Sequence, residues 1–486
     1  MLKKITNILL SCILILIAII LVRTITYDAP EPIISINNEN PELDIDPMSL
    51  ANNLSAAIQF KTISKEDQAQ IDKKAFNHFV DWVRSTYPLV HKKLQLIKIN
   101  QHTLVFYWRG LQPEKPAILM SAHYDVVPVN PGTEQDWQHA PFDGVIDQEY
   151  IWGRGAMDDK GSAIAMLEAI NALANKDFKP QGDIYVALTH DEEIGSQFGA
   201  QAVANWLAKK KVDIAWSLDE GSAVIDGIVP GITKQIAMIN VAEKGYLNLE
   251  LVANAEGGHS SMPPKDTAVS ILADGIVKLR DNPVAGGLTG VSEIMYDKLG
   301  RHMSLGYRIL FANTWLFKPI IEKVMGDIPS GNAMLRTTTA PTMLTGSIKS
   351  NVLPISATAI VNFRLHPRDT IDDVINHVKR VINDERIEVN TVTAQSASTI
   401  ATMDSSGFNI IAEQASAAYG DVIVTPGITI AATDSRFYSE ITQSYRFSPM
   451  ILNKQDLARM HGTNERISID NMVKAVRFYA GIMRQQ

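Results

Sequence analysis

Apolar and polar positions alternate in two different ways along the chain, and the change falls near residue 246. Before it, short apolar runs alternate with longer segments of helical periodicity. The runs that predict strands are LVFYW (104–108), AILMSAH (117–123), DIYVALT (183–189) and IAWSLDE (214–220), and helices are predicted over 161–176 and 198–211. This alternation indicates an α/β sheet that is mostly parallel and covered by helices on both faces.

After residue 246 the strands alternate between apolar and polar positions, as half-exposed strands do. The predicted order is a strand at 245–253, a helix at 266–281, strands at 342–350 and 356–365, a helix at 370–384 and a strand at 386–394. This βαββαβ order with an antiparallel sheet is ferredoxin-like. Residues 282–340 interrupt it and are expected to be mostly helical. Helices at 407–420 and 468–485 then return the chain to the first domain.

The N-terminus carries an apolar stretch from Ile5 to Val22, preceded by Lys3 and Lys4 and followed by Arg23. This is about the length needed to cross a bilayer, and it favours an uncleaved transmembrane anchor with the body on the extracytoplasmic side. A cleaved signal peptide is the alternative, although such apolar regions are shorter and end in a small-residue cleavage site.

These patterns predict five segments. Residues 1–24 are an anchor, 25–47 a tether, 48–245 and 401–486 the two parts of a catalytic domain, and 246–400 an inserted α+β lid or dimerisation domain that contains the interruption at 282–340. The formal net charge of −8 and the lack of a long basic run argue against nucleic acid as a partner. Cys12 is the only cysteine, which excludes an intrachain disulfide and a cysteine nucleophile in the globular part.

Titratable side chains gather where the predicted strands end. His123 and Asp125 follow one strand, Glu192 and Glu193 follow the next, and Asp219 ends another; the turn GRGAMDDKG adds Asp158 and Asp159. Taken singly, each has a structural explanation, as a buried histidine, a helix cap or a surface turn. Together they place one imidazole and several carboxylates at one sheet edge, where uncompensated negative charge costs several kcal/mol. Histidine and carboxylate ligands without thiolates fit zinc, manganese or cobalt.

Six motifs in one order carry a family resemblance: SAHYDVVPV, GRGAMDDKG, DEEIGS, LDEG, GGHSSMP and HGTNERI. The chain resembles the dinuclear zinc peptidases that include glutamate carboxypeptidase, aminoacylase and succinyl-diaminopimelate desuccinylase. The segments ATDSRFY (432–438) and HGTNE (461–465) look most like the carboxypeptidase S branch, which also contains N-acyl-amino-acid hydrolases.

The resemblance implies two Zn²⁺ ions per chain, with Co²⁺ or Mn²⁺ as substitutes. His123 and Asp219 would hold one zinc, Glu193 and His461 the other, and Asp158 would bridge both. Asp125 would orient the His123 ring. Glu192 remains as the general base, and a cis peptide is implied between Asp158 and Asp159.

The lid supplies further candidates. By resemblance, His259 in GGHSSMPP would stabilise the oxyanion, in some relatives across a dimer interface, so a homodimer through the lid is expected. Asn351 and Arg364 match residues that hold a substrate carboxylate, and Arg436 is a second anion-binding candidate. A surface histidine and a surface ion pair are the alternatives. His102, His139, His190 and His366 are expected to be structural.

Two hypotheses follow. The first is a membrane-tethered zinc hydrolase that cleaves amide bonds of small peptides with a free C-terminus, as a carboxypeptidase or dipeptidase does, or of N-acyl amino acids. The second is a non-catalytic, membrane-tethered ligand-binding protein on the same fold. Glu192 discriminates between them, because a protein that only binds has no use for the base.

Overall fold

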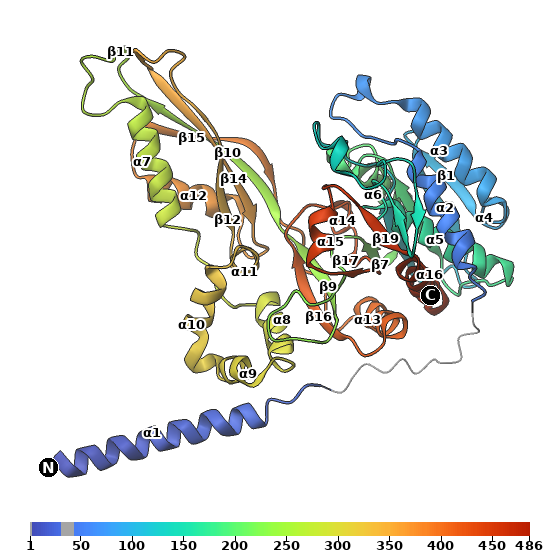
Figure 1. The fold of residues 1–486 in the computed structure, drawn as a ribbon, viewed down its shortest axis with the longest axis horizontal. Helices are drawn as coiled ribbons and strands as arrows, with labels where there is room; N and C mark the ends of the chain where they lie inside the picture. The colour runs from blue at the N-terminus through green and yellow to red at the C-terminus, as the bar shows by residue number, and fades with distance from the viewer. Residues whose placement is uncertain (1, 31–42) are drawn as a thin grey trace.

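The computed structural model describes residues 2–30 and 43–486, so residues 31–42 of the expected tether lie outside the described residues. Two large sheets lie side by side, and α1 (Leu2–Ile25) projects away from both (Figure 1). The strands of the first sheet are β1 (Gln95–Ile99), β2 (Thr103–Trp108), β3 (Ala117–His123), β6 (Ile184–Thr189), β7 (Ile214–Asp219), β8 (Val224–Ile225), β9 (Ile236–Glu243), β16 (Ile423–Thr429), β17 (Gln443–Arg446) and β18 (Ile451–Leu452).

This first sheet is mixed, whereas the sequence predicted a mostly parallel one. Its order is β1-β2-β6-β3-β7-β17-β9-β8-β18, with β16 paired to β9. The central pairs β6–β3, β3–β7 and β7–β17 are parallel. At one edge, Asn100 and Gln101 (φ 48° and 72°) form a tight turn that joins β1 to β2 as an antiparallel hairpin, and β2 also pairs antiparallel to β6.

The central strands are buried on both faces, which explains their uninterrupted apolar runs. In β3, Ile118, Met120 and Ala122 face one apolar cluster, and Ala117 and Leu119 face another. The helices of this part are α2 (Pro47–Gln59), α3 (Lys73–Thr86), α4 (Pro88–Lys93), α5 (Lys160–Asn175), α6 (Ala200–Lys210), α13 (Ser406–Tyr419), α14 (Ser435–Tyr438), α15 (Lys454–Arg459) and α16 (Ile469–Gln485).

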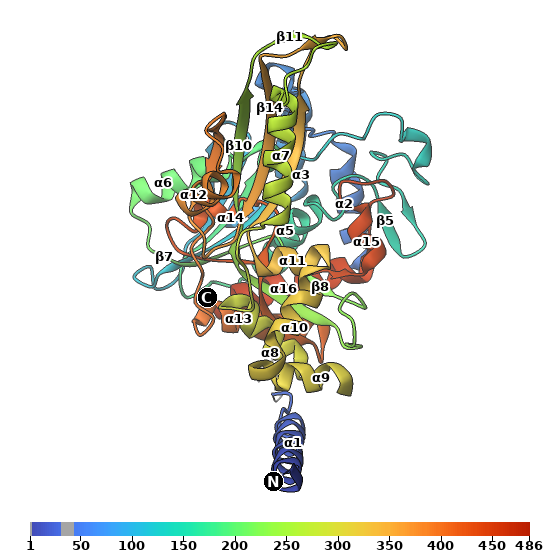
Figure 2. The same cartoon turned by 90° about the vertical axis from the view of Figure 1, so that its left-hand side faces the viewer.

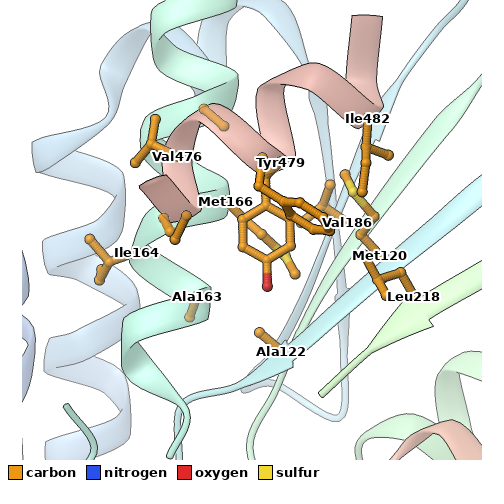
Figure 3. Close-up of a cluster of buried hydrophobic side chains, with 14 of the residues drawn as sticks. Met120, Ala122, Ala163, Ile164, Met166, Val186, Leu218, Val476, Tyr479 and Ile482 are labelled. Atoms are coloured by element: carbon orange, nitrogen blue, oxygen red, sulfur yellow. The ribbon is translucent and has the colours of Figure 1, made fainter. Parts of the chain in front are cut away.

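Helices α5 and α16 pack together over one face of the sheet. In Figure 3 the Tyr479 ring of α16 reaches between Met166 of α5 and the strand residues Met120 and Val186. Full burial of each such side chain contributes roughly 1.5–3 kcal/mol. The α16 helix therefore ties the C-terminal part of the chain to the strands whose ends carry the candidate site. A small separate sheet consists of β4 (Ile146–Asp147), β5 (Tyr150–Trp152) and β19 (Arg466–Ser468), and its strand β19 contacts α16.

The second sheet is antiparallel, with the order β12-β14-β10-β15. Its strands are β10 (Gly245–Asn254), β12 (Thr338–Thr345), β14 (Ser356–Leu365) and β15 (Ile387–Gln395), and its helices are α7 (Ala268–Asp281) and α12 (Ile371–Ile382). Leu247, Leu249 and Leu251 alternate with half-exposed residues and pack against α7 and α12. This is the ferredoxin-like order that the sequence predicted. The short strands β11 (Gly258–His259) and β13 (Val352–Leu353) pair at its far end (Figure 1).

Residues 282–340 form the helices α8 (Val291–Gly300), α9 (Leu305–Ala312), α10 (Thr314–Gly326) and α11 (Pro329–Leu335), in agreement with the sequence. Their packing was not foreseen. Although they interrupt the second sheet in sequence, they join an apolar cluster with Met238 and Ile423 of the first sheet. Tyr27 belongs to the same cluster, so the first residues of the expected tether pack against the body.

Among the described residues, α1 is the helix that is long and apolar enough to cross a membrane, and its apolar stretch is not buried inside the protein.

Candidate metal centre

The site lies where parallel strands end at one edge of the first sheet. Strand β3 ends at His123, and Glu192 and Glu193 lie in a short 3₁₀ helix (Glu192–Ile194) after β6. Because β6, β3 and β7 are parallel neighbours, their carboxyl ends meet at the same edge. Asp158 comes from the turn before α5, and His461 from the loop between α15 and β19.

Asp158 lies between two imidazoles. Its Oδ1 is 2.9 Å from His123 Nε2, and its Oδ2 is 3.0 Å from His461 Nε2. The same His461 nitrogen is 3.3 Å from Glu193 Oε2. One carboxylate thus presents a separate oxygen to each histidine, which is the arrangement that a ligand bridging two cations requires. The His461 side chain is 55% exposed, so this side of the site is open to solvent.

The carboxylate beside His123 in the structure is that of Glu220, the residue that follows the predicted ligand Asp219. Glu220 Oε1 lies 3.6 Å from His123 Nε2, whereas Asp219 is in none of the potential ligand groups among the described residues. Asp219 is the last residue of β7, and successive side chains along a strand point to opposite sides. The Asp219 carboxylate is buried, and its Oδ2 has no hydrogen-bond partner among the described residues. The motif LDEG carried the signal for an acidic ligand but could not say which of its two acids it was.

The residues brought together can hold metal. Potential ligand atoms lie within 4.8 Å of one another in three groups, namely His123–Glu192–Glu193, His123–Asp158–Glu220 and Asp158–Glu193–His461. Glu193 Oε1 is buried and has no hydrogen-bond partner among the described residues. Nitrogen and oxygen donors without thiolates suit a divalent cation such as zinc, manganese or cobalt.

The electrostatics of the site point the same way. Burial raises the pKa of Glu220 to about 7, and it raises the pKa of Glu192 well above its usual range. Hydrogen bonds to Asp158 and Glu193 raise the pKa of His461 to about 10. Four carboxylates around two imidazoles therefore favour extra protons in the protein alone. Divalent cations would supply that positive charge instead of protons.

Asp125 connects the two strand ends. Its carboxylate accepts hydrogen bonds from the backbone N–H groups of Glu192 (3.1 Å) and Glu193 (3.2 Å). His123 Nδ1 lies 3.0 Å from the Asp125 carbonyl oxygen and 3.4 Å from its carboxylate. The backbone carbonyl is therefore the nearer acceptor for the ring, while the Asp125 side chain fixes the paired glutamates.

A second carboxylate, Glu465, joins the turn that carries Asp158 to the loop that carries His461. It accepts hydrogen bonds from the backbone N–H groups of Met157 (2.9 Å) and Asp158 (3.2 Å). Arg154 donates to Glu465 at 2.7 Å and to the Gly462 carbonyl oxygen at 2.8 Å. The Asp158–Asp159 peptide is cis, as the family resemblance implied. In the sequence, Glu465 stands out only as part of the motif HGTNERI, and no pattern there indicates its ion pair with Arg154.

The candidate substrate-binding residues fall in different places. Arg436 of α14 lies beside the loop that carries Glu192 and Glu193. Its Nη2 is 3.3 Å from Ser196 Oγ, and its Nε has no partner among the described residues. Arg364, at one end of β14, stacks over the Tyr246 ring at 4.7 Å. The third is Asn351, whose backbone carbonyl oxygen accepts a hydrogen bond from Ser260 N beyond the other end of β14.

His259 stands with Asn351 at the far end of the second sheet, exposed and hydrogen-bonded to Ser261. Figure 1 places β11 well away from the strands that carry the candidate ligands. The structure thus does not bring His259 or Asn351 to the site within one chain. The histidines expected to be structural have other partners: His102 contacts Asn77, His139 Asp147, His190 Thr103 and His366 the backbone of Arg368.

Comparison with known proteins shows which family the chain resembles. The model for peptidase family M20/M25/M40 matches residues 119–485. The chain is 38% identical to probable carboxypeptidase S-like 2 of Dictyostelium discoideum, over 99% of this chain and 93% of that protein. It is 35% identical to N-fatty-acyl-amino acid synthase/hydrolase PM20D1 of Xenopus tropicalis, over 97% and 93% respectively.

Among solved structures, the M20 family metallo-carboxypeptidase Sso-CP2 from Sulfolobus solfataricus is 21% identical, with a TM-score of 0.62 over 90% of this chain and 98% of that one. Human carnosine dipeptidase 1 is 14% identical, with a TM-score of 0.63 over 91% and 98%. At this identity the two structures support the fold. Together with the family model, these matches confirm the resemblance drawn from the six motifs.

Proposed function

The chain belongs to peptidase family M20/M25/M40, and from that premise we propose that it is a dinuclear zinc hydrolase of amide bonds. The substrates proposed are N-acyl amino acids and small peptides with a free C-terminus. The observation that carries the proposal is the placement of Asp158 between His123 and His461, with Glu192 close by and not needed as a bridge. His123, Glu220 and Asp158 would hold one zinc, and Asp158, Glu193 and His461 the other.

Each protein residue has a distinct task in this scheme. When bound, zinc supplies Lewis acidity that polarises the scissile carbonyl and makes water more acidic. Glu192, whose Oε2 lies 4.0 Å from His123 Nε2, takes the proton from the attacking water. Burial raises the pKa of this carboxyl group, which makes it a stronger proton acceptor. Glu192 then returns the proton to the leaving amine.

Arg436 is the proposed holder of the substrate carboxylate. Its guanidinium lies beside Ser196, three residues after Glu193, and can form a two-pronged contact with a carboxylate. Arg364 and Asn351 cannot share one carboxylate within a chain, because they lie at opposite ends of β14 (Ser356–Leu365). A ten-residue strand spans roughly 30 Å. We assign Asn351 and His259 to a site completed by a second copy or by closure of the second sheet as a lid.

We propose that α1 is an uncleaved anchor and that the body lies on the extracytoplasmic side. Lys3 and Lys4 precede the apolar stretch, and basic residues are retained on the cytoplasmic side of such helices. The hydrogen bonds of Arg23, Thr24 and Tyr27 with the body support retention of α1, since a signal peptide that is removed needs no specific contacts with the mature protein.

Hydrolysis of a matched substrate panel tests the proposed chemistry. Each N-acyl amino acid and each dipeptide is paired with its C-terminal amide, and both are assayed with Zn²⁺, Mn²⁺ and Co²⁺. We expect turnover of the free acids, at least tenfold slower turnover of the amides, and loss of turnover in Glu192→Gln. Tight binding of the free acids without turnover under any of the metals would instead establish the ligand-binding protein.

A further inference from the structure

Helix α10 (Thr314–Gly326) exposes an apolar face. Its outward positions recur with helical spacing at 315, 316, 319, 320, 323 and 324, and all but Lys323 are apolar. Trp315, Ile320 and Val324 are each more than half exposed, at 54%, 53% and 55%. A helix on the surface of a water-soluble domain normally turns polar residues outward. This face is therefore built for surroundings other than water.

The exposed apolar face of α10 is not the face that packs against the body. Ile321 of α10 is buried, and Phe317 and Met325 pack with it against the cluster shared by α8, α9 and the first sheet. The helix is thus apolar on both sides. Leu305 and Tyr307 of α9 and Ile328 after α10 are also exposed. We call the set the α9–α10 patch; it consists of Leu305, Tyr307, Trp315, Leu316, Ile320, Val324 and Ile328.

The last turn of α1 is attached to the corner between α9 and α10. Arg23 Nε donates to the Ala312 carbonyl oxygen at 3.0 Å, and Asn313 Nδ2 lies 3.2 Å from Thr24 Oγ1. Arg308 donates to the Thr24 carbonyl oxygen at 3.1 Å. In Figures 1 and 2, α9 is the part of the body that lies nearest to α1. The apolar stretch of α1 therefore ends at the corner that joins the two helices of the patch.

We propose that the α9–α10 patch lies in the interface of the membrane that α1 crosses, so that the body rests on the bilayer instead of hanging from a free tether. The proposal rests on the membrane placement of α1 under the proposed function. Its occupant is a lipid surface, because the patch continues the apolar end of α1. Trp315 and Tyr307 are the residue types that concentrate at the headgroup level.

Spin labels on the full-length chain in phosphatidylcholine–phosphatidylserine liposomes test this. The native Cys12 reports on α1. In a Cys12→Ser background, single cysteines at Ile320→Cys and Val324→Cys report on the patch, and Leu111→Cys, exposed near the C-terminal end of α16, is the control. Collisions of the nitroxide with oxygen are compared with those with a water-soluble nickel chelate. Unchanged hydrolysis of a soluble substrate verifies that each labelled variant is folded.

We expect labels at 12, 320 and 324 to collide more with oxygen than with nickel, and the label at 111 to do the reverse. A lipid-exposed Cys12 with water-exposed labels at 320 and 324 would overturn the patch proposal and leave the anchor intact. A water-exposed Cys12 would remove the anchor. Spin–spin broadening at 320 that disappears on dilution with unlabelled chain would show a contact between two copies, and would also overturn the proposal.

Discussion

Arg154 and Glu465 form an ion pair that is closed to solvent, with 2.7 Å between Arg154 Nη1 and Glu465 Oε2 and side chains 1% and 0% exposed. The pair joins segments that are 311 residues apart in sequence. Because Glu465 also accepts from the backbone N–H of Asp158, it holds the proposed bridging ligand in register with the loop that carries His461. A buried pair of this kind is costly to break, since the remaining charge has no partner.

The first prediction concerns this pair. Glu465→Gln should lower the free energy of unfolding by about 3 kcal/mol and reduce the zinc bound per chain, because Arg154 keeps a buried, uncompensated charge. Calorimetry and metal analysis measure both effects. Asp177→Asn is the matched control, since the Lys93–Asp177 pair has the same 2.7 Å separation but is exposed. That variant should melt almost as the parent does. Equal melting temperatures for both variants would contradict the proposed positioning role.

The sequence predicted those strands and helices whose burial leaves a clear pattern of apolar residues. Strands β3, β6 and β7 are buried on both faces, so their apolar runs marked them clearly. Strand β17 (Gln443–Arg446) was missed because QSYR has neither an apolar run nor a regular alternation, although it lies between β7 and β9. Helices α8–α11 were expected, but an apolar helix face does not specify which sheet it will cover.

The candidate site, too, could be predicted from the sequence only in part. Motifs placed His123, Asp158 and Glu193 on the correct strand ends and turn, and family resemblance supplied His461, which no periodicity marks. The choice between Asp219 and Glu220 depended on the direction of a side chain at the end of β7, which the sequence does not contain. The distance of His259 from the site depends on how the two sheets sit relative to each other, and the motif GGHSSMP is silent on that arrangement.

The second prediction separates those two acids. Glu220→Gln should reduce zinc binding and turnover, because it removes the carboxylate that faces His123 at 3.6 Å. Asp219→Asn should retain zinc, since Asp219 lies outside the potential ligand groups among the described residues and Asn keeps the size of its side chain. Metal content after dialysis against a chelator compares the two variants. If Asp219→Asn loses zinc and Glu220→Gln retains it, the original sequence-based assignment is restored.

The third prediction concerns pH. Burial, together with Arg368 and Lys244, lowers the pKa of His366 from 6.5 to about 3. The folded state therefore resists protonation, so this contribution to stability is complete above pH 6.5 and is lost as the pH falls toward 3. The loss is at most about 1.4 kcal/mol per pH unit.

His366→Asn keeps a hydrogen-bond acceptor for Arg368 N but cannot titrate. Its melting temperature should fall less between pH 7 and pH 5 than that of the parent chain. His78→Asn, which removes an exposed imidazole, is the control. Parallel pH profiles for the parent and His366→Asn would refute the assignment.

The fourth prediction tests the carboxylate holder. Arg436→Lys should raise KM for free-acid substrates by roughly 10- to 100-fold, as loss of a charge-assisted hydrogen bond of about 1.5–3 kcal/mol implies. KM for the C-terminal amides should change much less. Arg364→Lys is the matched comparison on β14. A larger KM effect at 364 than at 436 would move the carboxylate site to the second sheet.

The last prediction concerns Glu192 and Glu193, which are neighbours in sequence but are assigned opposite tasks. Glu192→Gln keeps the size of the side chain and removes its basicity. Both zinc sites should stay filled, because the proposed ligands are unaltered, while kcat falls by at least the roughly 10²–10⁴ that a general base supplies. The fall should persist across the pH range, since an amide cannot recover a proton acceptor at higher pH.

Glu193→Gln should behave differently because its carboxylate Oε2 shares the His461 nitrogen with Asp158. A neutral amide is a poor zinc ligand, so one zinc should be lost on dialysis and part of the activity should return with excess metal. Excess zinc should not rescue Glu192→Gln, and this contrast separates a missing base from a missing ligand. Rescue of Glu192→Gln with no rescue of Glu193→Gln would reverse the two roles, and full activity in both variants would remove the catalytic site from this sheet edge.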